Sequence, residues 1–326
     1  MNQQRVQVPI IDLTAADQTV SIALDHAFGE MGFAVLIGHG ISPNVITAAR
    51  AAVVSYFEQS LDQKLQDRIR RENYRGYIPL GFFSPNSASQ IPDRYEGYKL
   101  HLEVDAGDPI CAACDLYGPN KWPRSQPHMR AAILNYWRDC DALTTRLLKI
   151  LAGILQIDAT GLLDAFDKSL TNMTLLHYPP QDANDSGVGI HAHKDTDALT
   201  LLAPDPVGGL LIRPRDSDEW IAIDAPANSL IVNIGDLLEL WSGGYFVSTP
   251  HKVINRSGQA RFSFPYFAVP RFDIVVSPLI PPRSGFTRSA VPVGDVSREV
   301  WRTNWPDTTP GGQGYDLGTL TDYADP

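Results

Sequence analysis

A change of pattern near residue 172 limits the possible folds more than any other feature of this sequence. Before it, apolar residues recur about once per helical turn over long stretches, as in residues 127–156. After it, apolar segments are short and β-branched or alternating, and turn residues separate them. Many short strands at regular spacing are typical of an antiparallel sandwich or barrel. We therefore expect a mainly β fold with flanking helices, whose strands cover residues 174–178, 199–203, 210–213, 220–223, 229–234, 247–254 and 261–269.

The first half of the chain predicts a helical region that packs on this β core. Ser42 and Pro43 are typical of a helix N-cap followed by proline at the first helical position. No Pro/Ser-rich linker separates the two halves, so we expect them to share one core. The expected elements are short strands over residues 8–13 and 33–37, helices over about 20–31, 43–57, 127–156 and 161–168, and long ordered loops over 73–125.

Composition and charge exclude several classes of partner. The net charge is −10 and no basic run stands out, which argues against nucleic acid as a partner. The longest apolar stretches, such as residues 147–157, are about half a bilayer span, so no membrane insertion is expected. The N-terminus has no signal-peptide pattern, and three cysteines are too few for a disulfide scaffold. These features predict a cytoplasmic protein, either a monomer or a weak homodimer.

Cys111 and Cys114 have the spacing of a redox pair or of half a zinc site. No second C-x-x-C or H-x-x-x-H follows to complete four ligands. The sequence therefore favours two thiols in a loop and leaves their role open.

The chemistry of the chain is concentrated in a histidine-rich segment, residues 189–197. Residues i and i+2 of a strand point to the same face, so His193 and Asp195 can present an imidazole and a carboxylate side by side. His251, in a predicted strand 56 positions beyond Asp195, is the best third ligand. Two histidines and one carboxylate on one face of an octahedron form the facial triad of non-haem Fe(II) oxygenases. Isolated H-x-D pairs also occur on surface strands, so the neighbouring residues decide the interpretation.

His191 has the same strand parity as His193 and Asp195. It is an alternative ligand, a contact to substrate or ligand, or a residue of the site's rim. The His–Asp spacing of i and i+2 favours His193 as the ligand.

Arg261 and Ser263 strengthen the interpretation as an oxygenase. A turn signal at residues 255–258 predicts a hairpin that places strand 261–269 beside strand 247–254, and hence both side chains near His251. A guanidinium matches a carboxylate, and an inward-pointing arginine in an apolar strand is costly unless it meets an anion. A dicarboxylate co-substrate beside iron meets that need. The alternative is that Arg261 pairs with a carboxylate of the protein.

On these residues the chain resembles the isopenicillin N synthase-like group of Fe(II)/2-oxoglutarate-dependent dioxygenases. The matching segments span about residues 8–270 in the family's order, and the last 55 or so residues lie outside them. They are VPIIDL (8–13), GFAVLIGHGI (32–41), RGY (75–77), GPNKWP (118–123), HKD (193–195), GGLLI (208–212), NIGD (233–236), His251 and RFS (261–263).

The resemblance implies a distorted double-stranded β-helix, a cupin-like jelly roll, with an N-terminal helical region. We expect four regions along the chain: residues 1–125 with helices and long loops, supporting helices over 126–170, the jelly-roll core with the iron and 2-oxoglutarate site over 171–275, and a C-terminal extension over 276–326 that covers the active site.

The resemblance also implies Fe(II) on His193, Asp195 and His251, with 2-oxoglutarate and O₂ as co-substrates. The far carboxylate of 2-oxoglutarate would lie on Arg261 and Ser263. Tyr178 matches a family tyrosine that can also touch the co-substrate. The family often has asparagine two positions before that tyrosine, but this sequence has Leu176, so one contact is missing or supplied by another side chain.

The implied reaction is the hydroxylation, desaturation or cyclisation of a small molecule, an amino acid or natural-product intermediate, with release of succinate and CO₂. Two rivals stay open: a 2-oxoglutarate-independent oxidase of the isopenicillin N synthase type, and a catalytically idle ligand-binding protein. A zinc hydrolase is a distant third. The candidate substrate contacts are His191, Phe83, Arg94, Tyr98 and Arg213, each of which has an ordinary structural alternative.

Overall fold

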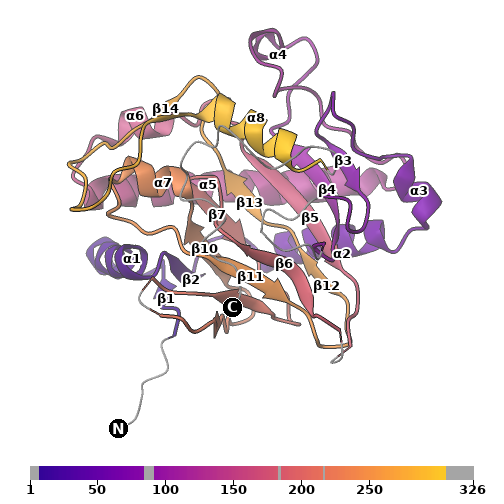
Figure 1. The fold of residues 1–326 in the computed structure, drawn as a ribbon, viewed down its shortest axis with the longest axis horizontal. Helices are drawn as coiled ribbons and strands as arrows, with labels where there is room; N and C mark the ends of the chain where they lie inside the picture. Colours follow the sequence, from indigo (N-terminus) through magenta and orange to yellow (C-terminus); the bar gives the residue numbers. More distant parts are fainter. Residues whose placement is uncertain (1–6, 84–91, 183–184, 216, 306–326) are drawn as a thin grey trace.

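Two β-sheets lie face to face in the computed structural model, which describes residues 7–83, 92–182, 185–215 and 217–305 (Figure 1). In the larger sheet the strands follow the order β1-β2-β10-β7-β13-β5-β4-β3, and β12 pairs with β5. These strands are β1 (Ile10–Asp12), β2 (Phe33–Ile37), β3 (Gly76–Ile78), β4 (Glu96–His101), β5 (Asn172–Tyr178), β7 (Leu199–Leu202), β10 (Leu230–Ile234), β12 (Arg261–Ser263) and β13 (Tyr266–Ala268).

The smaller sheet has the order β6-β11-β8-β9 and is antiparallel throughout. Its strands are β6 (Val188–His193), β8 (Leu210–Ile212), β9 (Ile221–Ala222) and β11 (His251–Ile254). Apolar side chains fill the space between the two sheets, among them Phe33, Val35, Leu176, Leu202, Ile212, Ile231 and Val253. The predicted double-stranded β-helix is confirmed.

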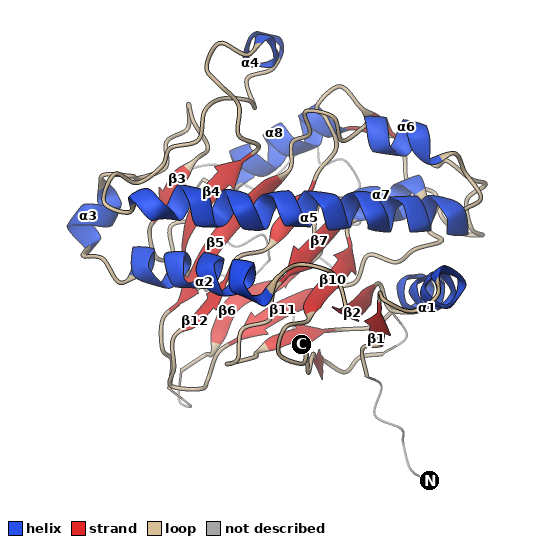
Figure 2. Ribbon diagram, turned by 180° about the vertical axis from the view of Figure 1, so that it is seen from behind, coloured by secondary structure: helices blue, strands red, loops and turns tan. Residues whose placement is uncertain are grey.

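Helices cover the other face of the larger sheet (Figure 2). The longest, α5 (Pro127–Ile154), packs Trp137 against Tyr266 and Tyr136 against Phe264, with edge-on rings in both pairs. In α2 (Pro43–Phe57), Ser42 accepts a hydrogen bond from the Asn44 amide, so the predicted N-cap is confirmed. The other helices are α1 (Asp17–Glu30), α3 (Leu61–Leu65), α4 (Pro109–Ala113), α6 (Ala159–Asp164), α7 (Asp236–Trp241) and α8 (Val293–Thr303).

The predicted hairpin between residues 247–254 and 261–269 is wrong. β11 pairs with β6 and β8 in the smaller sheet, whereas β12 pairs with β5 in the larger one. The turn after β11 therefore carries the chain from one sheet to the other, and the Asn255 side chain braces it by donating to the Gln259 carbonyl. The closeness of β11 and β12 in the sequence suggested that they pair with each other. In a jelly roll, however, many successive strands belong to opposite sheets.

The predicted long loops over residues 73–125 contain ordered elements that the sequence did not reveal. They include β3 and β4, which extend the larger sheet beyond β5. Because β1 to β4 belong to the same sheet as β5, β7 and β10, the N-terminal region and the predicted core region share one sheet.

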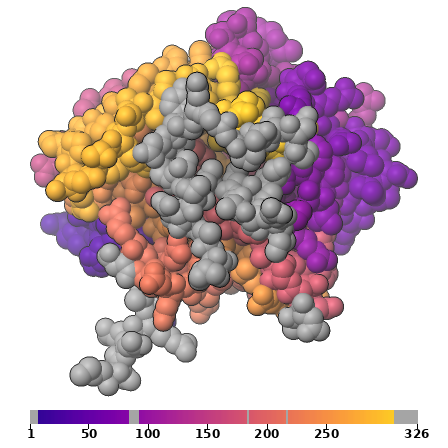
Figure 3. Space-filling view, in the orientation of Figure 1, coloured from indigo at the N-terminus to yellow at the C-terminus, as the bar shows by residue number. Residues whose placement is uncertain are grey.

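The C-terminal extension is described as far as Trp305 and includes a two-stranded sheet of β14 (Val275–Val276) and β15 (Val291–Pro292), followed by α8. Residues 276–305, orange to yellow, form the upper left of the face seen in Figure 3. The rest of the extension lies outside the described residues. Across the described ranges, no helix has the length and apolar character needed to cross a membrane.

A buried ionic cluster fixes β4 to the helical layer. Glu96 of β4 accepts hydrogen bonds from Lys64 Nζ at 2.8 and 2.9 Å and from the Tyr77 hydroxyl at 2.5 Å. His177 of β5 contacts the same carboxylate at 2.7 Å through Nδ1. The side chains of Lys64 and Glu96 are only 9% and 8% exposed, so each charge depends on the other for compensation.

Glu96→Ala is expected to lower the free energy of unfolding by about 3–5 kcal/mol, because it leaves the Lys64 ammonium buried without a counter-charge. Glu72→Ala, at an exposed position, is the matched control and should change stability by less than about 0.5 kcal/mol. Urea denaturation followed by circular dichroism measures both. A Glu96→Ala protein as stable as the control would contradict this account of the cluster.

Candidate metal centre and its surroundings

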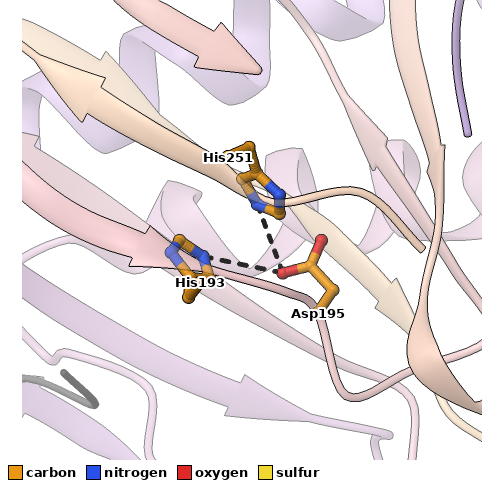
Figure 4. A group of neighbouring side chains, drawn as sticks. All are labelled: His193, Asp195 and His251. Carbon is orange, nitrogen blue, oxygen red and sulfur yellow. Dashed lines mark ion pairs between the residues drawn. The ribbon is translucent and has the colours of Figure 1, made fainter. Parts of the chain in front are cut away.

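Three side chains converge at one end of the smaller sheet (Figure 4). β6 ends at His193, β11 begins at His251, and these two residues are direct partners in the antiparallel register. Asp195 follows two residues after β6, and its Oδ1 lies 3.8 Å from His193 Nε2 and 3.5 Å from His251 Nε2. One ligand atom from each residue lies within 4.8 Å of the others. The three residues therefore have the spacing needed to hold one metal ion.

The larger sheet holds the Asp195 carboxylate in place. Thr200 Oγ1 on β7 donates to Asp195 Oδ2 at 2.6 Å, and Asn233 Nδ2 on β10 donates to the same oxygen at 2.8 Å. The Asp236 amide donates to the Asp195 carbonyl at 2.8 Å. Since Oδ2 is engaged, Oδ1 faces the two imidazoles. Asp195 thus owes its position to these contacts and not to strand parity, because β6 has already ended.

Backbone carbonyls orient both imidazoles. His193 Nδ1 lies 2.8 Å from the His191 carbonyl, and His251 Nδ1 lies 3.2 Å from the Thr249 carbonyl. A carbonyl only accepts hydrogen bonds, so each Nδ1 carries the proton and each Nε2 is left as a ligand atom. Phe33 packs edge-on against His251 with ring centroids 5.5 Å apart. Contacts within the protein therefore orient both rings.

The electrostatics of the three residues suit a cation. Burial disfavours the ionised carboxyl of Asp195, but His251 and His193 together with hydrogen bonds hold its pKa below the ordinary value. Burial also disfavours a charge on His251, yet Asp195 raises its pKa above the usual value. Burial and the neighbouring His251 lower the pKa of His193. The site therefore offers one carboxylate and two imidazoles in a desolvated setting.

A second buried carboxyl, Asp197, lies behind the first. Thr200 Oγ1 is 2.8 Å from Asp197 Oδ2 as well as 2.6 Å from Asp195 Oδ2. A hydroxyl has one proton to donate. Burial and the charge of Asp195 raise the pKa of Asp197 well above its ordinary value, which favours the neutral form of this carboxyl.

Arg261 lies on β12, across the sandwich from the smaller sheet. Its Nε donates to the Gly208 carbonyl at 2.7 Å, and its guanidinium lies 4.8 Å from the centre of the Tyr178 ring. Its Nη1 is buried and has no hydrogen-bond partner among the described residues. The alternative that Arg261 pairs with a protein carboxylate finds no support among those residues, since none forms an ion pair with it. Ser263 is buried on the same strand, opposite Leu176.

The predicted substrate contacts occupy several different environments. His191 Nδ1 lies 2.6 Å from Asp93 Oδ1, so this imidazole already has a carboxylate partner. His191 does not belong to the group of His193, Asp195 and His251 that could hold a metal ion. Arg94 is 43% exposed and lies 3.6 Å from Asp185. Arg213 follows β8, and its guanidinium lies 5.3 Å from the centre of the Trp220 ring.

Two further candidates are buried among other aromatic side chains. Tyr98 is fully buried on the helical side of β4, edge-on to Tyr56, so alternation along the strand points it away from the space between the sheets. That placement does not support a substrate contact. Phe83 stacks on Tyr74 with ring centroids 5.8 Å apart and packs near Trp305, in an aromatic cluster that includes the end of the described C-terminal extension.

Sequence reasoning missed the residues that orient the ligands. Thr200 and Asp197 carried no signal of their own in the sequence, and neither did Asp93, the partner of His191. Asn233 belonged to a matching segment, NIGD, but no role was inferred for it. Cys111 and Cys114 are free thiols and belong to no potential metal cluster within the described ranges.

Comparison with known protein families assigns the chain to a class. Residues 170–270 match the family model described as the 2OG-Fe(II) oxygenase superfamily, and residues 8–125 match the N-terminal model described as non-haem dioxygenase in morphine synthesis. Together with the geometry of the site and the similarity to curated relatives, these matches show that the chain belongs to the 2-oxoglutarate/Fe(II)-dependent oxygenase superfamily.

Individual relatives agree with this class. Homoarginine-6-hydroxylase of Arabidopsis thaliana is 33% identical over 268 residues, which cover 78% of each chain. The 2-oxoglutarate-dependent dioxygenase 11 of Oryza sativa subsp. japonica is 31% identical over 283 residues, 85% of this chain and 75% of the relative. The protein is accordingly a dioxygenase that uses Fe(II) and 2-oxoglutarate and oxidises a small molecule. The resemblance inferred from the sequence is confirmed.

Solved structures share the fold. A putative 2OG-Fe(II) oxygenase family protein from Caulobacter crescentus superposes with a TM-score of 0.79 at 24% identity, covering 90% of this chain and 98% of that one. A full-length Neurospora crassa protein in complex with alpha-KG gives a TM-score of 0.76 at 25% identity, covering 90% of this chain and 96% of that one.

Thr200→Val is expected to weaken Fe(II) binding about 10- to 100-fold, because it removes the hydroxyl between Asp195 and Asp197 while preserving the side-chain shape. Thr200→Ser keeps the hydroxyl and should bind Fe(II) within about threefold of the unmodified protein. Anaerobic titration of the metal-free protein with Fe(II) provides the comparison. Equal affinities for the valine and serine variants would refute the orienting role of Thr200.

Proposed function

We propose that His193, Asp195 and His251 hold the Fe(II) of this dioxygenase and that Arg261, Ser263 and Tyr178 bind the far carboxylate of 2-oxoglutarate. The observation that carries the proposal is the convergence of three ligand atoms within 4.8 Å. The buried, unpaired Nη1 of Arg261 on the facing sheet supports the co-substrate site, since a guanidinium there needs an anion. Two histidines and a carboxylate leave three positions of an octahedron open.

The bound iron and 2-oxoglutarate would supply the oxidising chemistry, with succinate and CO₂ as products. The protein's part is to position the reactants. Thr200 and Asn233 hold Asp195, and two backbone carbonyls direct the imidazole Nε2 atoms to one point. Tyr178, buried beside Arg261, closes the co-substrate end against water. The apolar side chains between the sheets keep the remaining surroundings dry.

Several finer features belong to the same proposal. The substrate is an amino acid or a natural-product intermediate, in keeping with a relative named homoarginine-6-hydroxylase. The C-terminal extension covers the site; in its support, Trp301 of α8 packs on Tyr74 and on His101 of β4. A cytoplasmic location and a monomeric or weakly dimeric state rest on the sequence, including three cysteines that are all free thiols.

Succinate formed per O₂ consumed tests the use of 2-oxoglutarate directly. A 1:1 ratio supports the proposal. Substrate oxidation without succinate would instead indicate an oxidase of the isopenicillin N synthase type. The absence of both succinate and the visible charge-transfer band of the anaerobic Fe(II)–2-oxoglutarate complex would indicate an idle ligand-binding protein. The relatives' names already disfavour both rivals.

His193→Ala is expected to abolish the charge-transfer band and to lower succinate formation at least about 100-fold, because one of three metal ligands is lost. The apolar core is untouched, so the thermal unfolding curve should remain cooperative. His26→Ala, at a 68% exposed position on α1, is the matched control and should behave as the unmodified protein does. Retained band and turnover in His193→Ala would remove this residue from the ligand set.

Arg261→Met is expected to raise the KM for 2-oxoglutarate at least about tenfold, since a charge-assisted hydrogen bond contributes about 1.5–3 kcal/mol. Arg138→Met, on the exposed side of α5, serves as control. Steady-state succinate formation against 2-oxoglutarate concentration measures the effect. An unchanged KM would disprove the anchoring role of Arg261.

A further inference from the structure

The inner face of the larger sheet carries a second polar cluster that the co-substrate site does not use. Lys99 of β4 donates through Nζ to Asn172 Oδ1 at 2.7 Å and to Thr174 Oγ1 at 2.9 Å, both on β5. Lys99 and Thr174 are direct partners in the register of β4 and β5. These two strands lie side by side in the larger sheet (Figure 1). Alternation along β5 puts Asn172 and Thr174 on the same face as Tyr178, which lies between the sheets.

This cluster is continuous with the supports of Asp195. A row of paired residues runs across the sheet from Asn172 through Phe267 and Thr200 to Asn233. Thr200 and Asn233 hold the Asp195 carboxylate, and Lys99 Nζ lies 5.6 Å from the centre of the Phe267 ring. Asn172 and Thr200 are two strands apart, which is roughly 10 Å. A half-buried phenyl ring therefore forms the floor between the ammonium group and the candidate metal centre.

Lys99 differs from Lys64 and Lys194, two other lysines that this fold encloses. Lys64 pairs with Glu96 at 2.8 Å, and Lys194 has Asp236 and Glu239 at 3.8 and 3.6 Å. Lys99 is half-buried, yet none of the described carboxylates lies within ion-pair distance of it. Its two partners are neutral oxygens. An ammonium group has three protons to donate, so one donor and the whole positive charge remain for another group.

The charge of Lys99 is sensitive to what binds there. Burial and the nearby Arg75 lower the pKa of Lys99 to about 7, and the charge of Asp195 offsets part of that shift. A bound anion would hold the ammonium in its charged form.

Lys99 is too far from Arg261 to share the co-substrate's carboxylate. Their partners on β5 are Thr174 and Tyr178, four residues apart, which corresponds to roughly 13 Å along the strand. We therefore expect Lys99 and Arg261 to bind two different anions at two separate positions along β5.

We propose that Lys99, with Asn172 and Thr174, binds the carboxylate of the substrate to be oxidised, whose apolar body lies over Phe267 toward the metal centre. This inference rests on the proposed function of the His193, Asp195 and His251 site. A single ammonium flanked by neutral acceptors suits a singly charged carboxylate better than a doubly charged phosphate. The substrate class is thus a carboxylic acid with an aryl or alkyl body.

Binding of small acids to the anaerobic Fe(II)–2-oxoglutarate complex tests the proposal. The probes are phenylacetate, 3-phenylpropionate and 4-phenylbutyrate, each compared with its primary amide, and the readout is the perturbation of the charge-transfer band. At pH 6.5 at least one acid is expected to bind about tenfold or more tightly than its amide, because a hydrogen bond to a charged group is stronger than one to a neutral group.

Lys99→Met should abolish this preference for acids, and Lys99→Arg should restore part of it. Lys149→Met, at an exposed position on α5, is the matched control and should keep the preference. Equal binding of acids and amides, no perturbation by any acid, or a preference that survives in Lys99→Met would each overturn the proposal. Loss of 2-oxoglutarate binding in Lys99→Met would also overturn it, by assigning Lys99 to the co-substrate.

The band itself separates this inference from the proposed function. If the unmodified protein forms no band with Fe(II) and 2-oxoglutarate, the proposed function fails and this inference fails with it. If the band forms but acids and amides perturb it equally, the proposed carboxylate site is wrong and the proposed function is unaffected.

Discussion

The position of one carboxylate, Asp195, depends on both sheets and completes the candidate metal centre. His193 and His251 come from the smaller sheet, whereas the hydrogen bonds that orient Asp195 come from Thr200 and Asn233 on the larger one. A shift of either sheet relative to the other would separate the carboxylate from the imidazoles. The apolar layer between the sheets sets their spacing. The three hydrogen bonds to Asp195 set the direction of its carboxylate, so the geometry of the site depends on both.

The fold class and the closeness of His193 and Asp195 were predictable because their signals are local. The short segments of alternating apolar residues after residue 172 and the spacing of His193 and Asp195 can each be recognised within a few neighbouring residues. The pairing of distant strands was not predictable. Arg261 was expected beside His251 through a hairpin, but the structure brings it to Tyr178 through β5 and leaves the two sheets facing each other. The strand β4 was missed for a similar reason, because it is stabilised by pairing with a strand more than 70 residues away.

The two faces of β4 each carry a buried charged side chain, Glu96 on one face and Lys99 on the other, and the two charges are compensated differently. On the helical side, Glu96 is surrounded by Lys64, Tyr77 and His177, so the charge there is compensated within the protein. On the inner side, the partners of Lys99 among the described residues are all neutral. A buried charge costs free energy in either case. The protein satisfies one charge internally, and under our proposal the other is satisfied only when substrate is present.

The length of β5 has a consequence for how such an enzyme can diversify. Its Tyr178 end contacts the arginine proposed for the shared co-substrate, and its Asn172 end contacts Lys99. Free-energy changes at sites more than about 7–10 Å apart are usually additive. Under our proposals, mutations around Lys99 would therefore alter which molecule is accepted and leave the 2-oxoglutarate site intact. Strand β5 thus separates the proposed 2-oxoglutarate site at its Tyr178 end from the proposed substrate site at its Asn172 end.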